Sequence, residues 1–157
     1  MPAGFGKLAS HMDVGWDLDG TLIGHPASTL LHQFIRATPR IRHVIVTFRN
    51  RKLHGDPWAD LAAYHGAPPR EAFDGAVFVQ DEAMEDFSRS HQATRAFWPL
   101  SRFMRRPTDG ACRRWKGQVC SRNGLTALVD DMTSMVASGC RQYGVELFHP
   151  KDFLPPS

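Results

Sequence analysis

The amino-acid sequence predicts one α/β domain, a three-layer sandwich built on a central parallel sheet of about five strands. Three observations predict this fold class. Short apolar runs alternate along the chain with longer stretches of helical periodicity. The 157 residues fit a single domain, and a hydrophobic fraction of 42% is typical of a folded globular chain. Acidic residues directly follow two of the apolar runs, where parallel sheets place their ligand-binding side chains.

Five short apolar runs are the predicted strands. They are residues 12–18, 43–48, 75–79, 125–129 and 145–148. The second run, HVIVTF, is rich in β-branched residues, which is the composition of a strand buried on both faces. Because helical stretches separate the runs, we expect the strands to pair in parallel and to form a Rossmann-like sheet.

Three segments with apolar residues at helical spacing are the predicted helices. They are residues 28–37, 56–65 and 132–143. Ser28 and Asp56 are the predicted N-caps, because their side chains can accept hydrogen bonds from the first free amides of a helix. Pro57 suits the first helical position, and Gly66 and Gly144 are placed to end their helices.

The two least regular parts of the chain are its beginning and its middle. Residues 1–11 are expected to be a tag or a disordered leader outside the fold, since residues 9–12 (ASHM) resemble a cloning scar. The single domain then spans residues 12–157. Residues 81–115 look mostly helical and are broken by prolines, and we expect them to form a small helical lid.

Composition excludes several classes of protein. No apolar run approaches the ~20 residues of a membrane-spanning helix, so we expect no membrane partner. Three cysteines without CxxC spacing argue against a disulfide framework or a zinc site, and they favour a reducing, cytoplasmic location. A net charge of +3 is compatible with an anionic substrate and leaves nucleic-acid binding open.

Acidic residues at two strand ends form the sharpest chemical signal. Asp17 and Asp19 follow the first predicted strand, and Asp130 and Asp131 follow the fourth. Ionised carboxylates at the end of a buried strand are costly to desolvate without a partner. A divalent cation removes that cost, and magnesium prefers such hard oxygen ligands. The sequence therefore predicts a Mg²⁺ site at this edge of the sheet.

With these residues in view, the chain resembles the phosphatases of the haloacid dehalogenase superfamily. The family's opening motif, DxDGT, matches residues 17–21 at every position. Thr47 matches the Thr or Ser that ends the second strand, Lys116 the following lysine, and Asp130-Asp131 the closing acidic pair. Lys116 precedes the acidic pair by 14 positions (130 − 116), a spacing similar to that of deoxyribonucleotidase-like members.

The resemblance implies a magnesium-dependent phosphatase that works through an aspartyl-phosphate intermediate. Asp17 is then the nucleophile. Asp19 is the general acid toward the leaving oxygen and afterwards the general base for water. Together with these two, Asp130 and Asp131 are the expected Mg²⁺ ligands. Only about one helix fits between the opening motif and the second strand, so the chain resembles the capless or minimally capped class, without a large cap domain.

Four further residues are candidates for substrate binding, and two arginines are alternatives for one of these four roles. Thr47 is expected to donate a hydrogen bond to the phosphoryl group, and Lys116 to balance its charge. Gly20 and Arg49 are additional candidates for substrate contacts. Two arginines directly before Trp115, at positions 113 and 114, compete with Lys116 for the basic role.

One departure from the family pattern concerns the closing motif. Members that read GDxxxD carry a second acid four positions after the first, where this chain has Ser134. Asp131 must therefore substitute for that acid. Ordinary structural roles are the alternative for each motif residue: a turn for Asp17 and Asp19, or a helix cap for the acidic pair.

The favoured substrate is a nucleotide or a nucleic-acid phosphate end, because residues 97–116 combine arginines with tryptophans. A sugar phosphate or a phosphoprotein is the alternative substrate. A different class of function is a catalytically idle module that binds phosphate and magnesium, and a third is a dehalogenase. A site without a large cap must have water excluded from it by another part of the protein. A second subunit could do this, so a homo-oligomer is a further expectation.

Overall fold

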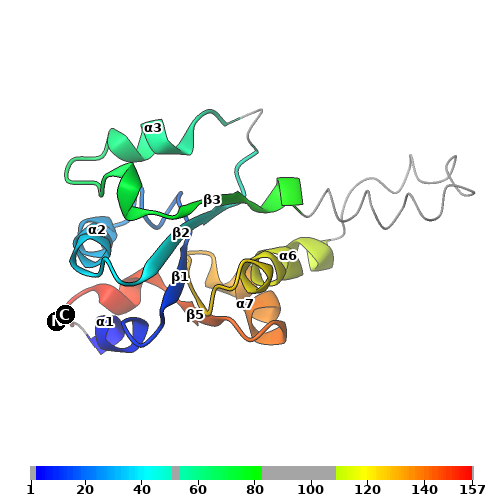
Figure 1. Ribbon diagram of the computed structural model, residues 1–157. Coiled ribbons are helices and arrows are strands. Elements are labelled where there is room, and N and C mark those ends of the chain that lie inside the picture. The colour runs from blue at the N-terminus through cyan, green and yellow to red at the C-terminus, as the bar shows by residue number, and fades with distance from the viewer. Residues whose placement is uncertain (1–2, 51–53, 83–108, 157) are drawn as a thin grey trace, which may run out of the picture.

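The computed structural model describes residues 3–50, 54–82 and 109–156 of the chain. Within these ranges, five strands form one all-parallel sheet in the order β3-β2-β1-β4-β5 (Figure 1). The strands are β1 (Asp13–Trp16), β2 (Arg42–Thr47), β3 (Gly75–Phe78), β4 (Ala127–Val129) and β5 (Glu146–Phe148). The predicted five-stranded, Rossmann-like parallel sheet is confirmed.

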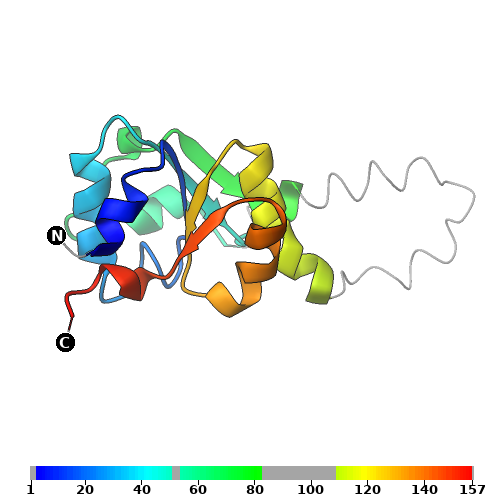
Figure 2. The ribbon, with the colours of Figure 1, turned by 90° about the horizontal axis from the view of Figure 1, so that it is seen from below.

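Helices cover both faces of this sheet. They are α1 (Ala3–Leu8), α2 (Ser28–Ala37), α3 (Pro57–Ala62), α6 (Asp109–Arg122) and α7 (Thr133–Gln142), with the 3₁₀ helices η1 (Arg70–Ala72) and η3 (Pro150–Phe153). The view from below shows α1 and α2 on one side of the strands and α6 and α7 on the other (Figure 2). The predicted three layers are therefore present.

Two hydrophobic clusters show how the strands divide their side chains between the faces. Ile45 belongs to the cluster that also contains residues of α1, α2 and η3. Its neighbours Val44 and Val46 belong to the cluster shared with α6 and α7. Successive residues of a strand point to opposite faces, so a strand buried on both sides needs the continuous apolar run seen in the sequence.

The predicted helix caps are confirmed in one case and wrong in the other. The Asp56 side chain accepts a hydrogen bond from the Trp58 amide at 3.0 Å and caps α3. Ser28 is not the N-cap of α2, since Ala27 occupies that position. The Ser28 hydroxyl instead donates to the Thr21 carbonyl oxygen at 2.7 Å, which ties α2 to the opening motif.

The expectation that residues 1–11 lie outside the fold is wrong for the described residues 3–11. Phe5 and Leu8 of α1 are buried in the first cluster, one helical turn apart. The Phe5 ring lies 5.1 Å from that of Phe34 in α2 and 4.7 Å from that of Phe153 in η3. Helix α1 therefore packs as part of the core, whatever the origin of the segment.

The regions where a cap or lid was expected have different outcomes. Between β1 and β2, the described residues contain α2 and no other helix or strand longer than an isolated bridge, so no cap domain lies there. Most of the predicted lid, residues 83–108, lies outside the described residues. Residues 109–115 of the predicted lid belong to α6, and residues 81–82 lie shortly after β3. No helix in the described ranges has both the length and the apolar character needed to cross a membrane.

Candidate functional site

The strand order brings the predicted site residues to one edge of the sheet. β1 lies between β2 and β4, and the chain continues outward from it in both directions. Asp17, Thr47 and Asp130 stand at or directly after the carboxyl ends of these three adjacent strands. This is the switch point at which open parallel sheets bind ligands, because the loops leave it on opposite faces.

Lys116 is buried between two of these carboxylates. Its Nζ atom donates to Asp17 Oδ1 at 2.6 Å and lies 2.6 Å from Asp130 Oδ2. The side chains of Lys116 and Asp130 are each 1% exposed, and that of Asp17 is 10% exposed. The ammonium group also lies 5.0 Å from the centre of the Phe48 ring. Such burial makes each of these charges dependent on the others.

Two glycines allow Lys116 to reach this depth from α6. A Cβ atom on Gly117 would lie 2.2 Å from the Gly139 carbonyl carbon in α7, and one on Gly139 would lie 2.7 Å from the Arg113 carbonyl oxygen. The two helix backbones therefore touch at this crossing, as only glycine permits. The prediction from sequence did not include this pair, although a glycine inside each helical stretch was its available signal.

The third carboxylate of the site belongs to Asp131. Carboxylate oxygens of Asp17, Asp130 and Asp131 lie within 4.8 Å of one another. Asp131 Oδ1 is buried and has no hydrogen-bond partner among the described residues. Asp130 Oδ2 also lacks a well-directed hydrogen bond, although Lys116 Nζ lies 2.6 Å away. Three carboxylates around one ammonium leave net negative charge, so the cluster fits a divalent cation with oxygen ligands.

Gly20 and Thr21 of the opening motif contact Asp131, the second residue of the acidic pair. Gly20 has φ +78°, and a Cβ atom there would lie 2.5 Å from Asp131 Oδ2. The Thr21 hydroxyl oxygen accepts a hydrogen bond from the Asp131 amide at 3.2 Å. Asp130 Oδ1 accepts from the Met132 amide at 2.7 Å, but neither aspartate caps α7, because Met132 occupies its N-cap position. Gly20 therefore lies against Asp131.

Burial and charge act in opposite directions on the ionisation of the site. Burial, helped by the nearby charges of Asp130 and Asp131, raises the pKa of Asp17 to about 7 against the lowering effect of the Lys116 ammonium. Burial disfavours the charged form of Lys116, yet Asp17 and Asp130 together raise its pKa above the ordinary value. Lys116 is therefore a permanent positive charge. A second cation nearby would favour the ionised form of Asp17.

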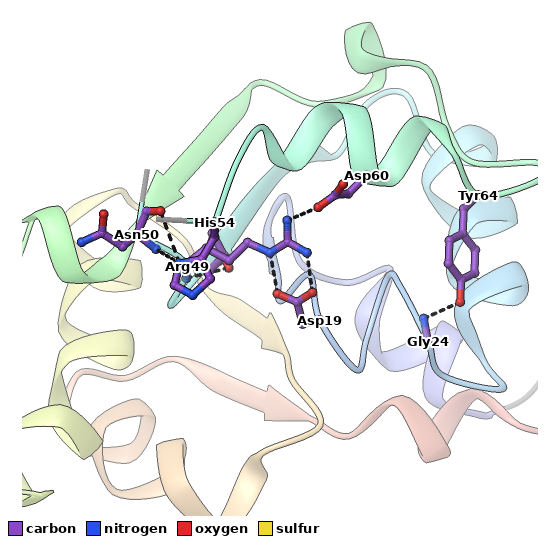
Figure 3. Close-up of polar contacts among 8 residues, drawn as sticks. Asp19, Gly24, Arg49, Asn50, His54, Asp60 and Tyr64 are labelled. Atoms are coloured by element: carbon purple, nitrogen blue, oxygen red, sulfur yellow. Dashed lines mark hydrogen bonds and ion pairs between the residues drawn. The ribbon is translucent and has the colours of Figure 1, made fainter. Parts of the chain in front are cut away.

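Asp19, two positions after Asp17, forms a second group with Arg49 (Figure 3). Arg49 donates from Nε to Asp19 Oδ2 at 2.7 Å and from Nη2 to Asp19 Oδ1 at 2.6 Å, while Nη1 donates to Asp60 of α3. The hydrogen bonds from Arg49 lower the pKa of Asp19, with burial opposing them. The Asp19 carboxylate is thus paired with Arg49, and the acidic cluster consists of the other three aspartates.

The remaining candidates are separated by their exposure. Thr47 is buried at the end of β2, and its hydroxyl oxygen accepts a hydrogen bond from the Arg49 amide at 3.1 Å. Arg113 and Arg114 are exposed, whereas Lys116 is buried against the two aspartates, so Lys116 fits the basic role. Ser134 is exposed on α7 and does not belong to the acidic cluster.

The predicted residues thus occupy two neighbouring groups at one edge of the sheet. The first contains Asp17, Gly20, Lys116, Asp130 and Asp131, with Thr47 on the adjacent strand, and the second contains Asp19 and Arg49. Sequence reasoning missed Asp60, which completes the second group from α3. In comparisons with known proteins, no family model matches this sequence, and neither a curated protein nor a solved structure matches it.

Proposed function

We propose that this chain is a magnesium-dependent phosphatase of the haloacid dehalogenase type, which hydrolyses a phosphomonoester through an aspartyl-phosphate on Asp17. One observation carries the proposal. The Lys116 ammonium is buried between Asp17 and Asp130, beside an Asp131 oxygen without a partner among the described residues. The order of the four sequence motifs supports the same conclusion.

The proposed metal ligands are Asp17, Asp130 and Asp131. Their fit rests on the unpartnered Asp131 oxygen and on a donor set made only of carboxylates. When bound, Mg²⁺ supplies positive charge that stabilises the phosphoryl oxygens and the ionised nucleophile. The backbone carbonyl of Asp19 remains a proposed fourth protein ligand.

The first half of the reaction uses Asp17 and Asp19. Lys116 holds Asp17 Oδ1, so we assign the attack on phosphorus to Oδ2. The new Oδ2–P bond forms as the bond from phosphorus to the leaving oxygen breaks, and the leaving oxygen takes a proton from Asp19. The negative charge of a phosphate group bound close to Asp19 favours the protonated carboxyl that this step requires.

The second half restores the enzyme. Asp19 takes a proton from a water molecule as the water oxygen attacks phosphorus, and the bond from phosphorus to Asp17 breaks. Inorganic phosphate then leaves and the Asp17 carboxylate is regenerated. Thr47 accepts from the Arg49 amide through a lone pair, so its hydroxyl proton can be donated to a phosphoryl oxygen. Lys116 balances the charge on Asp17 throughout.

The proposed substrate remains a nucleotide or a nucleic-acid phosphate end, with a sugar phosphate or a phosphoprotein as the alternative. Its support is the composition of residues 97–116, of which 97–108 lie outside the described residues. A second copy of the chain is the proposed source of cover for the exposed side of the site, where Asp19 is 56% exposed.

Turnover with and without Mg²⁺ tests the proposal. We expect wild-type protein to hydrolyse p-nitrophenyl phosphate and at least one member of a panel of nucleotides and sugar phosphates, and to lose this activity in EDTA. Asp17→Asn should lower kcat by about a thousandfold or more, because the amide is a poor nucleophile. Asp13→Asn is the matched control, since Asp13 lies at the opposite end of β1 and pairs with Arg42.

The alternative functions give different results. Turnover that Asp17→Asn leaves unchanged contradicts the mechanism. Mg²⁺ binding measured by calorimetry without turnover of any phosphate ester favours the idle binding module. Release of halide from a haloacid in EDTA favours the dehalogenase, because that reaction needs no magnesium.

A further inference from the structure

Helix α3 is linked to the loop after β1 through Arg49, and Tyr64, two residues after the end of α3, contacts the same loop directly (Figure 3). Near one end of the loop, Asp60 of α3 accepts a hydrogen bond from Arg49, which holds Asp19. At the other end, the Tyr64 hydroxyl oxygen accepts from the Gly24 amide at 2.7 Å. A helix outside the four sequence motifs is thus linked, through Arg49, to the loop that carries the proposed acid–base residue.

The loop itself leaves little freedom in the backbone of Asp19. The Gly20 amide donates to the Ile23 carbonyl oxygen at 2.7 Å, and the Ile23 amide donates to that of Leu18 at 2.8 Å. The side chain of Asp19 is less restricted by burial, since 56% of it is exposed. Its orientation therefore depends on the partner of its carboxylate.

Arg49 has the geometry to set that orientation. A guanidinium that meets a carboxylate through Nε and Nη2 fixes both the direction and the plane of the carboxylate. The Arg49 side chain is 13% exposed, far less than Asp19 or Asp60. The remaining nitrogen, Nη1, donates to Asp60, so Asp60 fixes the rotation of the guanidinium.

We propose that Asp60 is a positioning residue, which acts through Arg49 to hold Asp19 in the orientation needed for proton transfer to the leaving group. This inference rests on the proposed function. Asp60 stays outside the acidic cluster and acts on the reaction only through Arg49. Helix α3 thereby becomes part of the acid–base machinery, although it contributes no proposed contact with the substrate.

The dependence of kcat/KM on the leaving group tests this role, because kcat/KM reports the steps up to departure of that group. Glycerol phosphate needs a general acid more than p-nitrophenyl phosphate does. In Asp60→Ala, we expect kcat/KM to fall about tenfold for glycerol phosphate and less than about twofold for p-nitrophenyl phosphate. Asp60→Glu should restore part of the loss, since it keeps a carboxylate for Arg49.

A matched variant separates positioning from helix stability. Asp56→Ala removes the N-cap of the same helix without touching Arg49. It should destabilise α3 and leave the ratio of the two kcat/KM values unchanged. Equal losses on both substrates in Asp60→Ala, or no loss on either, would overturn the positioning role.

A measurement without turnover keeps this inference separate from the proposed function. The Nε–H signal of Arg49 in a ¹⁵N NMR spectrum should be protected from exchange in wild-type protein and should exchange faster in Asp60→Ala. An unchanged signal overturns the inference, whatever the activity. Wild-type protein without phosphatase activity overturns the proposed function, and the Arg49 signal then still decides whether Asp60 holds the pair.

Discussion

Two groups of three charged side chains meet at this edge of the sheet, and each consists of one cation between two aspartates. The buried triad is Asp17–Lys116–Asp130, and the exposed triad is Asp19–Arg49–Asp60. In the buried triad no side chain is more than 10% exposed, whereas the two carboxylates of the exposed triad are 56% and 52% exposed. The two triads therefore have the same arrangement of charges but differ in their exposure to solvent.

The difference in burial assigns different work to the two triads. Removing one member of a buried group leaves an uncompensated charge, which typically costs about 3–5 kcal/mol. Exposed ion pairs contribute only about 0.2–1 kcal/mol, because water already solvates their members. The stability of the fold should therefore depend on all three charges of the buried triad. The exposed triad should contribute little to stability and act mainly by orienting the Asp19 carboxylate. The cations agree with this division, since lysine is a point charge and arginine a planar fork.

The largest expected effect comes from removing the cation of the buried triad. Lys116→Met should lower the free energy of unfolding by about 3–5 kcal/mol in EDTA, because Asp17 and Asp130 are left together without it. Urea unfolding measures this loss. Mg²⁺ should restore part of the stability, since a cation bound by the same carboxylates replaces some of the missing charge.

An exposed lysine provides the control for that measurement. Lys7 is 67% exposed and pairs with Glu146. Lys7→Met should therefore cost less than about 1 kcal/mol. A loss in Lys116→Met no larger than that of Lys7→Met would contradict the dependence of the buried carboxylates on Lys116.

An intermediate effect is expected at Gly20, which borders the acidic cluster. In Gly20→Ala, the new methyl group meets Asp131 Oδ2 at 2.5 Å and the backbone has φ +78°. Backbone strain at such a position is of the order of 1–3 kcal/mol. Displacement of Asp131 should therefore weaken the proposed Mg²⁺ binding by about tenfold. Calorimetry measures this affinity. Gly24→Ala has a similar φ of +82° and open space around its Cβ position, so it should leave Mg²⁺ affinity unchanged.

The buried triad was largely predictable from the sequence, and the reason is local. Asp17 and Asp130 each follow a strand that its own composition reveals, and parallel pairing then places both at one edge. Lys116 was chosen among neighbouring basic residues by its resemblance to a motif. Its Nζ atom lies 2.6 Å from an oxygen of each of the two aspartates, while its chemical role remains a proposal.

Two of the three residues of the exposed triad were predictable. Asp19 belongs to the opening motif and Arg49 lies two positions after Thr47, but Asp60 lies on an exposed helix face, where an aspartate carries no distinguishing pattern. Its role depends on how α3 is rotated relative to β2, and tertiary packing sets that rotation. The core position of Phe5 was not predicted for another reason: the likeness of residues 9–12 to a cloning scar assigned residues 1–11 to a tag or leader.

The smallest expected effect is the response of the two triads to salt. Raising NaCl from about 0.1 M to about 1 M shortens the Debye length from about 10 Å to about 3 Å. The contribution of Asp60 to stability, measured as the difference between wild type and Asp60→Ala in urea unfolding, should shrink by a few tenths of a kcal/mol because this ion pair is exposed. Because Asp60 lies in the first turn of α3, the change reports its charge interactions with Arg49 and with the helix N-terminus together. The penalty of Lys116→Met should stay nearly constant, because solvent ions do not reach a side chain that is 1% exposed. Equal salt dependence of the two penalties would contradict the distinction between the triads.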